Sequence, residues 1–274
     1  MKILSLVFNL SRPRFWLYTA GPFIVGAAFA VHDVYQLNTP AFWIGLLFFL
    51  IPANMYLYGV NDLADEDTDE HNTKKTSHEI KLAESNKRIY IVSIMISIAT
   101  LLLLQSVFSA QSFLLTSIFM GLATMYSLPP IRLKARPYLD FLSNILYVVP
   151  GLVGYSLFTG QLPPLPIIVA CGAWTGAMHL YSAIPDIQSD TQAKLQTTAV
   201  LLGRMNSLWL CFVLWSICAI IVAFYSPFFV FILVYPFLTL RVIIGQLDLT
   251  GLYWRFPWIN GIIGFILFWY AIFS

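Results

Sequence analysis

Residues 41–60 read AFWIGLLFFLIPANMYLYGV and contain no charged side chain. A helix needs about 20 mostly apolar residues to cross the hydrocarbon core of a bilayer, and this stretch has that length. The next residues, 61–69, read NDLADEDTD and carry a cluster of carboxylates. We therefore predict a membrane-spanning helix that ends in an acidic motif at the membrane surface.

The composition of the whole chain is typical of a membrane protein. Of its 274 residues, 59% are hydrophobic and 10% are charged, and the mean hydropathy is +0.77. A soluble globular protein has about a quarter of its residues charged, so that class is excluded. The net charge of +2 provides no basic face for a nucleic acid, and we expect no such partner. The expected surroundings are membrane lipids.

Apolar runs bounded by charged residues, prolines and glycines predict an all-α protein with nine membrane spans. The predicted ranges are 15–31, 41–60, 89–108, 112–126, 138–158, 165–184, 206–225, 227–245 and 256–273. If the spans alternate in direction, all 15 lysines and arginines fall on the side of the N-terminus. Cytoplasmic loops carry the excess of Lys and Arg. We therefore predict an integral protein of the plasma (inner) membrane whose N-terminus and acidic loops are cytoplasmic and whose C-terminus is external.

A weak internal repeat appears when the sequence is offset by 124 residues. The offset aligns Asp62 with Asp186, Ala53 with Ala177, and Arg12-Pro13 with Arg136-Pro137. It contains four predicted spans, and an even number returns the second copy to the same orientation. We predict one integral-membrane domain with two parallel four-helix halves, about 1–126 and 127–245, and a last span at 256–273. Both acidic motifs would then face one central cavity.

The two acidic motifs have spacings that suit metal binding. If the helix of residues 41–60 continues, one face carries Asn54, Tyr58, Asn61, Asp65 and Asp69. The second motif, DIQSD at 186–190, follows the sixth predicted span and places two carboxylates one helical turn apart. Mg²⁺ typically binds through one or two carboxylates together with the phosphates of a substrate. The motifs therefore predict a Mg²⁺ site for a diphosphate.

Basic and polar residues beside these motifs complete the expected site. The short connection YSLPPIRLKARP, residues 126–137, is stiffened by prolines and places cations on the same side as the acids. Cations bind phosphate oxygens well. The residues expected to bind the diphosphate are Arg12, Arg132, Lys134 and Lys194. The residues expected to position the substrates are Asn54, Tyr58, Tyr126 and Tyr181. Single polar groups within spans also serve as interhelical hydrogen-bond partners.

The two motifs resemble those of the UbiA-type intramembrane prenyltransferases, which carry N-D-x-x-D-x-x-x-D after the second span and D-x-x-x-D after the sixth. Residues 61–69 and 186–190 match both patterns, and the resemblance covers essentially the whole chain. It implies a Mg²⁺-dependent transfer of an isoprenyl group from an allylic diphosphate to a hydrophobic acceptor from the bilayer. The catalytic residues that it implies are Asp62, Asp65, Asp186 and Asp190. The metal ligands that it implies are Asn61 and Asp65 for one ion and Asp186 and Asp190 for the other, with Asp62 and Asp69 supporting or sharing them.

Four shorter stretches are similar to the lycopene elongase branch of this family. They are Ser11–Trp16, Phe48–Asn54, Ile184–Asp186 and Thr197–Ala199. This resemblance implies a C5 donor and lycopene or a related acyclic carotenoid as acceptor. Members of the family commonly have a glycine after the second motif, where this chain has Lys194.

The sequence is also compatible with other functions. Prenylation of an aromatic or quinone precursor and cyclisation of a terpene would use the same metal site. An ion-coupled transporter would use carboxylates as ion sites, but such transporters commonly have inverted repeats, whereas the repeat here is parallel.

Overall fold

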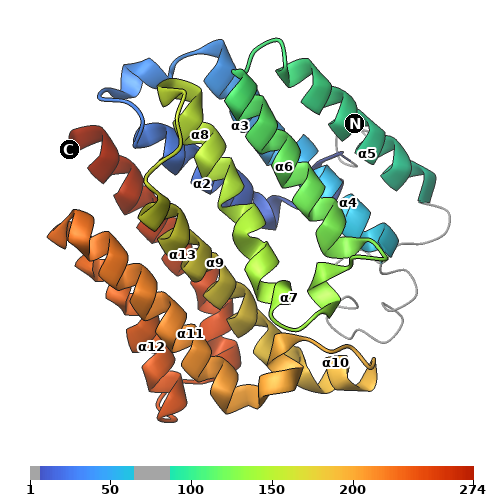
Figure 1. Ribbon diagram of the computed structural model, residues 1–274, viewed down its shortest axis with the longest axis vertical. Coiled ribbons are helices and arrows are strands. Elements are labelled where there is room, and N and C mark those ends of the chain that lie inside the picture. The colour runs from blue at the N-terminus through green and yellow to red at the C-terminus, as the bar shows by residue number, and fades with distance from the viewer. Residues whose placement is uncertain (1–6, 65–86) are drawn as a thin grey trace. The chain divides into compact units, whose positions relative to one another are not determined.

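The computed structural model describes residues 7–64 and 87–274. In this part of the chain every regular element is a helix, which confirms the predicted all-α class. In chain order the elements are η1 Pro13–Phe15, α2 Trp16–Ala28, η2 Val34–Leu37, α3 Pro40–Leu50, α4 Pro52–Ala64, α5 Lys87–Leu104, α6 Ala110–Ser127, η6 Leu133–Ala135, α7 Leu139–Leu142, η7 Ser143–Tyr147, α8 Val149–Thr159, α9 Leu165–Ala183, η8 Ile184–Asp186, α10 Ile187–Gln192, α11 Thr198–Tyr225, η9 Pro227–Leu233, α12 Val234–Ile243 and α13 Leu249–Phe273. Figure 1 labels the α-helices.

Six helical stretches in the described part of the chain are long and apolar enough to cross a membrane. They are Pro40–Ala64, Lys87–Leu104, Leu139–Thr159, Leu165–Gln192, Thr198–Tyr225 and Leu249–Phe273. Helices also lie in the other three predicted spans, but α2 has 13 residues and is about 20 Å long, short of a hydrocarbon core of ~30 Å. These long apolar helices are those of an integral membrane protein. The count of nine spans stays a prediction.

The helices pack as two compact units. The first comprises Met1–Ile131, Val149–Leu162 and Asn260–Ser274, and the second comprises Arg132–Val148 and Pro163–Ile259. Each acidic motif therefore belongs to a different unit, and each is described within its own. The expected single domain with two sequence halves stays a prediction.

In the first unit, two helices far apart in the sequence, α2 and α8, lie side by side (Figure 1). Glycines permit this contact. A Cβ atom added to Gly26 would lie 2.0 Å from the carbonyl oxygen of Gly151, and one added to Gly154 would lie 2.1 Å from that of Phe23. Small residues let helix backbones approach in this way inside membranes. The close contact joins the start of the chain to a segment near its middle.

A break divides the predicted span at 41–60 into α3 and α4. Pro52 has no N–H to donate, and a carbonyl left without a donor is costly in a bilayer. The Asn54 amide nitrogen donates to the carbonyl oxygens of Phe49 and Leu50, at 2.7 and 3.1 Å, and to Thr19 Oγ1 at 2.8 Å. Thr19 also donates to the Phe49 oxygen. Asn54 thus stabilises the break, two turns before the first acidic motif.

Aromatic rings form the core of the second unit. The Trp215 ring lies between those of Tyr181, Tyr235 and Phe256, with centroid distances of 5.8, 5.5 and 5.4 Å. All four side chains are buried. They come from α9, α11, α12 and the first half of α13, so the cluster holds these four helices together. Helix α9 leads directly to the second acidic motif.

Candidate active site

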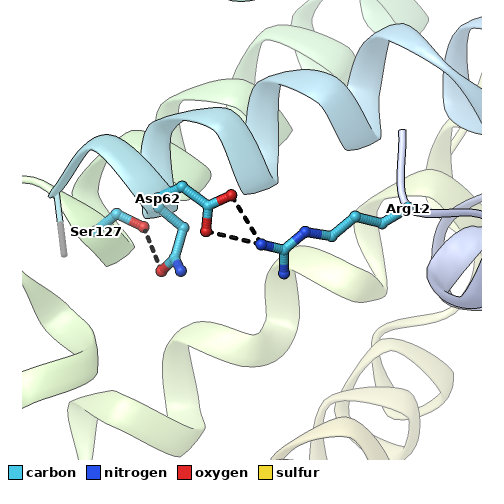
Figure 2. A network of polar contacts seen from close by, with 4 residues as sticks. Arg12, Asp62 and Ser127 are labelled. Carbon is cyan, nitrogen blue, oxygen red and sulfur yellow. Dashed lines mark hydrogen bonds and ion pairs between the residues drawn. The ribbon is translucent and has the colours of Figure 1, made fainter. Parts of the chain in front are cut away.

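An ion pair holds the first acidic motif. Asp62 lies near the end of α4 and is 3% exposed. One Arg12 nitrogen, Nη2, donates to both carboxylate oxygens of Asp62, at 2.7 and 2.8 Å (Figure 2). The Arg12 guanidinium carbon also lies 4.7 Å from the centre of the Tyr58 ring. The contacts bring together three predicted site residues, and they pair the charge of Asp62 with that of Arg12.

Asn61 is held by a different neighbour. Its side-chain oxygen accepts a hydrogen bond of 3.2 Å from the Ser127 hydroxyl at the end of α6 (Figure 2). One turn and a half earlier, the hydroxyls of Tyr56 and Thr124 lie 2.7 Å apart. The two contacts fix the end of α4 against α6. They leave Asn61 and Asp62 on different sides of α4, as expected for adjacent positions on a helix.

The described part of α4 ends at Ala64, so the predicted helix continues at least that far beyond residue 60. The predicted ligands Asp65 and Asp69 lie outside the described residues. Within residues 7–64 and 87–274, no group of three or more His, Cys, Asp or Glu side chains is arranged to hold a metal ion. The metal roles of the motif residues therefore stay predictions.

The carboxylates of the second motif lie one helical turn apart. Asp186 is the last residue of η8 and directly precedes α10, which contains Asp190. Both residues are half-buried. The Thr197 hydroxyl lies within 3.4 Å of Asp190 Oδ2, to which it donates. The helical backbone through 186–190 thus produces the spacing that the sequence predicted for two ligands of one metal ion.

Lys194 ends α10 in the left-handed conformation, with φ of 57°. The Leu195 N–H donates to the Asp190 carbonyl, and the Lys194 N–H donates to that of Thr191. These bonds form a Schellman cap, in which glycine is the usual residue at the left-handed position. Gly245 has the corresponding place at the end of α12, with φ of 74°. The exposed Lys194 therefore adopts the backbone conformation that the family's glycine favours.

The cationic segment Arg132–Arg136 has a defined backbone. Arg132 is left-handed, with φ of 39°, and its carbonyl accepts from the Ala135 N–H within η6. Tyr138, directly before α7, also has a positive φ, of 66°, with ψ of −39°. Arg132 and Lys134 are half-buried, whereas Arg136 is exposed. This fixed geometry places the basic side chains within the same unit as the second acidic motif.

Two residues of this region, Asp140 and Thr198, were not among the residues predicted from the sequence. Both are buried, and the Thr198 backbone N–H donates to Asp140 Oδ2 at 2.7 Å. The signal available in the sequence was a carboxylate inside a predicted span, because such groups are costly there and usually have a specific partner.

The remaining predicted substrate-positioning residues have distinct surroundings. Tyr181 is buried in the aromatic core of the second unit, and its hydroxyl donates to the Leu249 carbonyl at 3.1 Å. Tyr126 is half-buried on α6, directly before Ser127. Tyr181 thus has a packing role, as Asn54 has at the helix break. Substrate contacts of these residues stay predictions.

Comparison with known proteins agrees with the motifs. Residues 19–255 match the model of the UbiA prenyltransferase family. The chain belongs to this family. It is therefore a prenyltransferase, as the sequence predicted. The transporter interpretation is not retained, because the match covers most of the chain, including both acidic motifs, at residues 61–69 and 186–190.

Similar proteins narrow the branch, and similar structures support the fold. The chain is 38% identical to a lycopene elongase/hydratase of Haloarcula japonica, covering 96% of this chain and 90% of that protein. It is 37% identical to a lycopene elongase/hydratase of Haloferax volcanii, with 94% and 85% covered. A UbiA homologue from Archaeoglobus fulgidus bound to GPP and Mg²⁺ has the same fold, with a TM-score of 0.76, 22% identity, and 98% and 99% covered.

Proposed function

We propose that this UbiA-family enzyme transfers a C5 isoprenyl group from an allylic diphosphate to lycopene or a related acyclic carotenoid, with Mg²⁺ as cofactor. The observation that carries the proposal is the similarity to proteins named lycopene elongase/hydratase, at 36–38% identity over most of each chain. The resemblance of four short stretches to the same branch, noted from the sequence, points to the same acceptor.

The residues of the acidic motifs fit a hard divalent cation. They provide carboxylate and amide oxygens, the ligands that Mg²⁺ prefers. We assign Asn61 with Asp65 and Asp69 to one ion and Asp186 with Asp190 to the other. Mg²⁺, when bound, neutralises charge that develops on a departing diphosphate. The Archaeoglobus homologue was solved with Mg²⁺ and with either GPP or DMAPP, a C10 and a C5 allylic diphosphate, which supports this class of donor.

Asp62 has a different role in this proposal, because its carboxylate is paired with Arg12. The pair, together with the Tyr58 ring, holds the guanidinium at a fixed place near the end of α4. A fixed guanidinium can donate to diphosphate oxygens without losing much side-chain entropy on binding. We assign Arg12, Arg132, Lys134 and Lys194 to the donor's diphosphate.

The proposed reaction forms a carbon–carbon bond between the donor and the acceptor. The C–O bond of the donor breaks and its electron pair leaves with the diphosphate, which produces an allylic cation. A terminal double bond of the acceptor attacks this cation. The new tertiary cation then either loses a proton to form a double bond, or adds water and loses a proton to form an alcohol. Aromatic faces stabilise positive charge, and aromatic residues make up 16% of the chain. The apolar helices keep water from the first cation until the acceptor attacks.

The polarity of the acceptor determines which side chains are needed to bind it. A polyene has no charged group, so apolar and aromatic side chains are sufficient to bind it. An aromatic acid would need a further cation for its carboxylate. The similarity to a homogentisate phytyltransferase of Synechocystis is lower, at 27% identity, which favours the carotenoid over an aromatic acceptor.

Expression in a host that accumulates lycopene tests the acceptor. We expect pigments heavier by one or two C5 units, with added hydroxyl groups if water quenches the terminal cation. The measurement is the mass spectrum of the extracted pigments, with an empty vector as control. Unchanged pigments despite well-expressed protein, together with prenylation of an aromatic acid in the same membranes, would contradict the carotenoid assignment and leave the diphosphate chemistry standing.

We also propose nine spans, arranged as two parallel four-helix halves and a last helix. Two packed helix pairs support the repeat: α4 packs on α5 in the first unit, and α9 packs on α11 in the second. The 124-residue offset relates these two pairs. The placement of all 15 lysines and arginines on one side supports a cytoplasmic N-terminus.

This topology predicts that a tag at Ser274 reacts with an impermeant external probe in intact cells. A tag placed at the N-terminus should react only after the membrane is permeabilised, since the positively charged side stays in the cytoplasm. The measurement is labelling of both tags before and after permeabilisation. Protection of the Ser274 tag in intact cells would contradict an odd number of spans.

A further inference from the structure

A buried carboxylate outside both acidic motifs joins separate segments of the second unit. Asp140 lies in α7 and is 1% exposed. Its Oδ1 accepts hydrogen bonds from the Phe141 N–H and the Thr198 hydroxyl, and its Oδ2 accepts from the Thr198 N–H. The Thr198 hydroxyl in turn accepts from the Tyr138 N–H. We refer to these two side chains and their bonds as the Asp140–Thr198 bracket.

The bracket lies between two groups that we assign to the donor. On one side, Tyr138, whose N–H donates to Thr198, lies two residues after the cationic segment Arg132–Arg136. On the other side, Thr197 directly precedes Thr198, and its hydroxyl donates to Asp190 of the second acidic motif. The cationic segment and the motif are therefore linked through consecutive threonines at the start of α11.

The chemistry of the bracket needs a carboxylate and a hydroxyl. Asp140 receives three donors, and only a group with two accepting oxygens satisfies all of them. An amide at this place would direct its NH₂ group at a donor. Thr198 both donates to Asp140 and accepts from Tyr138, which only a hydroxyl can do. Valine has nearly the shape of threonine but has neither function.

Packing of the helix alone does not require this arrangement. Helix α11 is already capped, because the Thr197 hydroxyl accepts from the Val200 N–H. Burial of a carboxylate costs free energy unless all its hydrogen bonds are made. Asp140 is a second carboxylate at the start of α11, in addition to Asp190, and we infer that it does more than cap the helix. What it fixes, beyond α11, is the end of the cationic segment.

We propose that Asp140 is a positioning residue for donor binding. Through Thr198 it holds the cationic segment at a fixed position relative to Asp190. The cations of this segment and the carboxylates of the second motif can then bind the same diphosphate. The inference rests on the proposed function in one respect, namely that the donor is a diphosphate. It does not depend on the identity of the acceptor.

The test compares Thr198→Val with Thr198→Ser in the full-length purified enzyme. Binding of inorganic pyrophosphate with Mg²⁺ is measured by calorimetry, without an acceptor. We expect about tenfold weaker binding for Thr198→Val, as for the loss of one charge-assisted contact, and nearly unchanged binding for Thr198→Ser. In turnover, the KM for the donor should rise about tenfold in Thr198→Val. The KM for the acceptor should stay unchanged.

Two further variants test whether the effect is specific to Asp140. Asp140→Asn should weaken pyrophosphate binding at least as much as Thr198→Val. Asp33→Asn makes the same chemical change at an exposed carboxylate that accepts from the Tyr35 N–H, and it should bind like the wild type. If Asp140→Asn does not fold, the two threonine variants carry the test.

The outcomes separate the inference from the proposed function. Equal pyrophosphate binding by the wild type and Thr198→Val would overturn the positioning role alone. A parallel rise of both KM values, or an equal loss in Thr198→Ser, would also overturn it, because a purely structural role predicts these results. Absence of pyrophosphate binding by the wild type would overturn the diphosphate site and the inference with it. Prenylation of an acceptor other than a carotenoid, with the expected split in KM, would overturn only the carotenoid assignment.

Discussion

Replacement of Asp186 by asparagine should abolish prenyl transfer while the protein stays folded in the membrane. Asparagine has nearly the same size, so packing around the half-buried side chain is kept. The negative charge that we assign to a Mg²⁺ ion is lost. Because metal-assisted loss of diphosphate depends on that ion, we expect turnover to fall on the order of a thousandfold or more. The measurement is release of pyrophosphate per enzyme, with the unfolding temperature as a check of the fold.

Asp33→Asn is the matched control for this experiment. Asp33 caps η2 through the Tyr35 N–H and is exposed, and we place it on the outer side of the membrane. Its replacement should leave turnover unchanged. Chelation of divalent cations should abolish the activity of the wild type, and addition of Mg²⁺ should restore it. Activity that persists under chelation, or equal losses for Asp33→Asn and Asp186→Asn, would show that the second motif holds no catalytic metal ion.

The second large effect concerns the pair Arg12–Asp62. We expect Arg12→Gln and Asp62→Asn each to lower turnover about a hundredfold, which corresponds to ~2.7 kcal/mol of transition-state stabilisation. Each change removes the oppositely charged neighbour of a largely buried charge, since the two side chains are 15% and 4% exposed. Removal of one member of a buried pair also lowers stability, typically by about 3–5 kcal/mol.

The double variant decides what Asp62 does. If Asp62 acts by holding Arg12, the double variant should lose no more turnover than Arg12→Gln alone, and it should be more stable than Asp62→Asn. Turnover is measured for all four proteins of the cycle, together with their unfolding temperatures. If the two losses instead multiply to about ten-thousandfold, Asp62 has an independent role, such as a metal ligand.

The sequence by itself determined the membrane character and the kind of chemistry. Long apolar runs such as residues 41–60 are stable in a bilayer, where a helix satisfies the hydrogen bonds of its own backbone. The all-α class therefore follows from the lengths of these runs. The motif at 186–190 likewise needs only local helical spacing to place two carboxylates one turn apart, and the structure has that helix. Short-range geometry of this kind is contained in the order of residues.

The partners of individual side chains were decided by the tertiary structure. Residue spacing places Asp62 after a span, but only folding brings Arg12, 50 positions away, within hydrogen-bond distance of it. The same holds for Asp140 and Thr198, which are 58 positions apart. Asn54 was expected near the substrate because it is polar and close to the motif, yet its amide donates to the carbonyls of Phe49 and Leu50, beside the break at Pro52.

The physical reason is the range of the interactions. Helical periodicity and span length act over one or a few turns, so they can be read along the chain. Pairing of buried polar groups depends on which helices become neighbours, and here that depends on close contacts such as the one between α2 and α8 at Gly26 and Gly151. The order of residues therefore determined where the charges and the predicted metal ligands lie along the chain, whereas packing between distant helices determined which of those charges are paired.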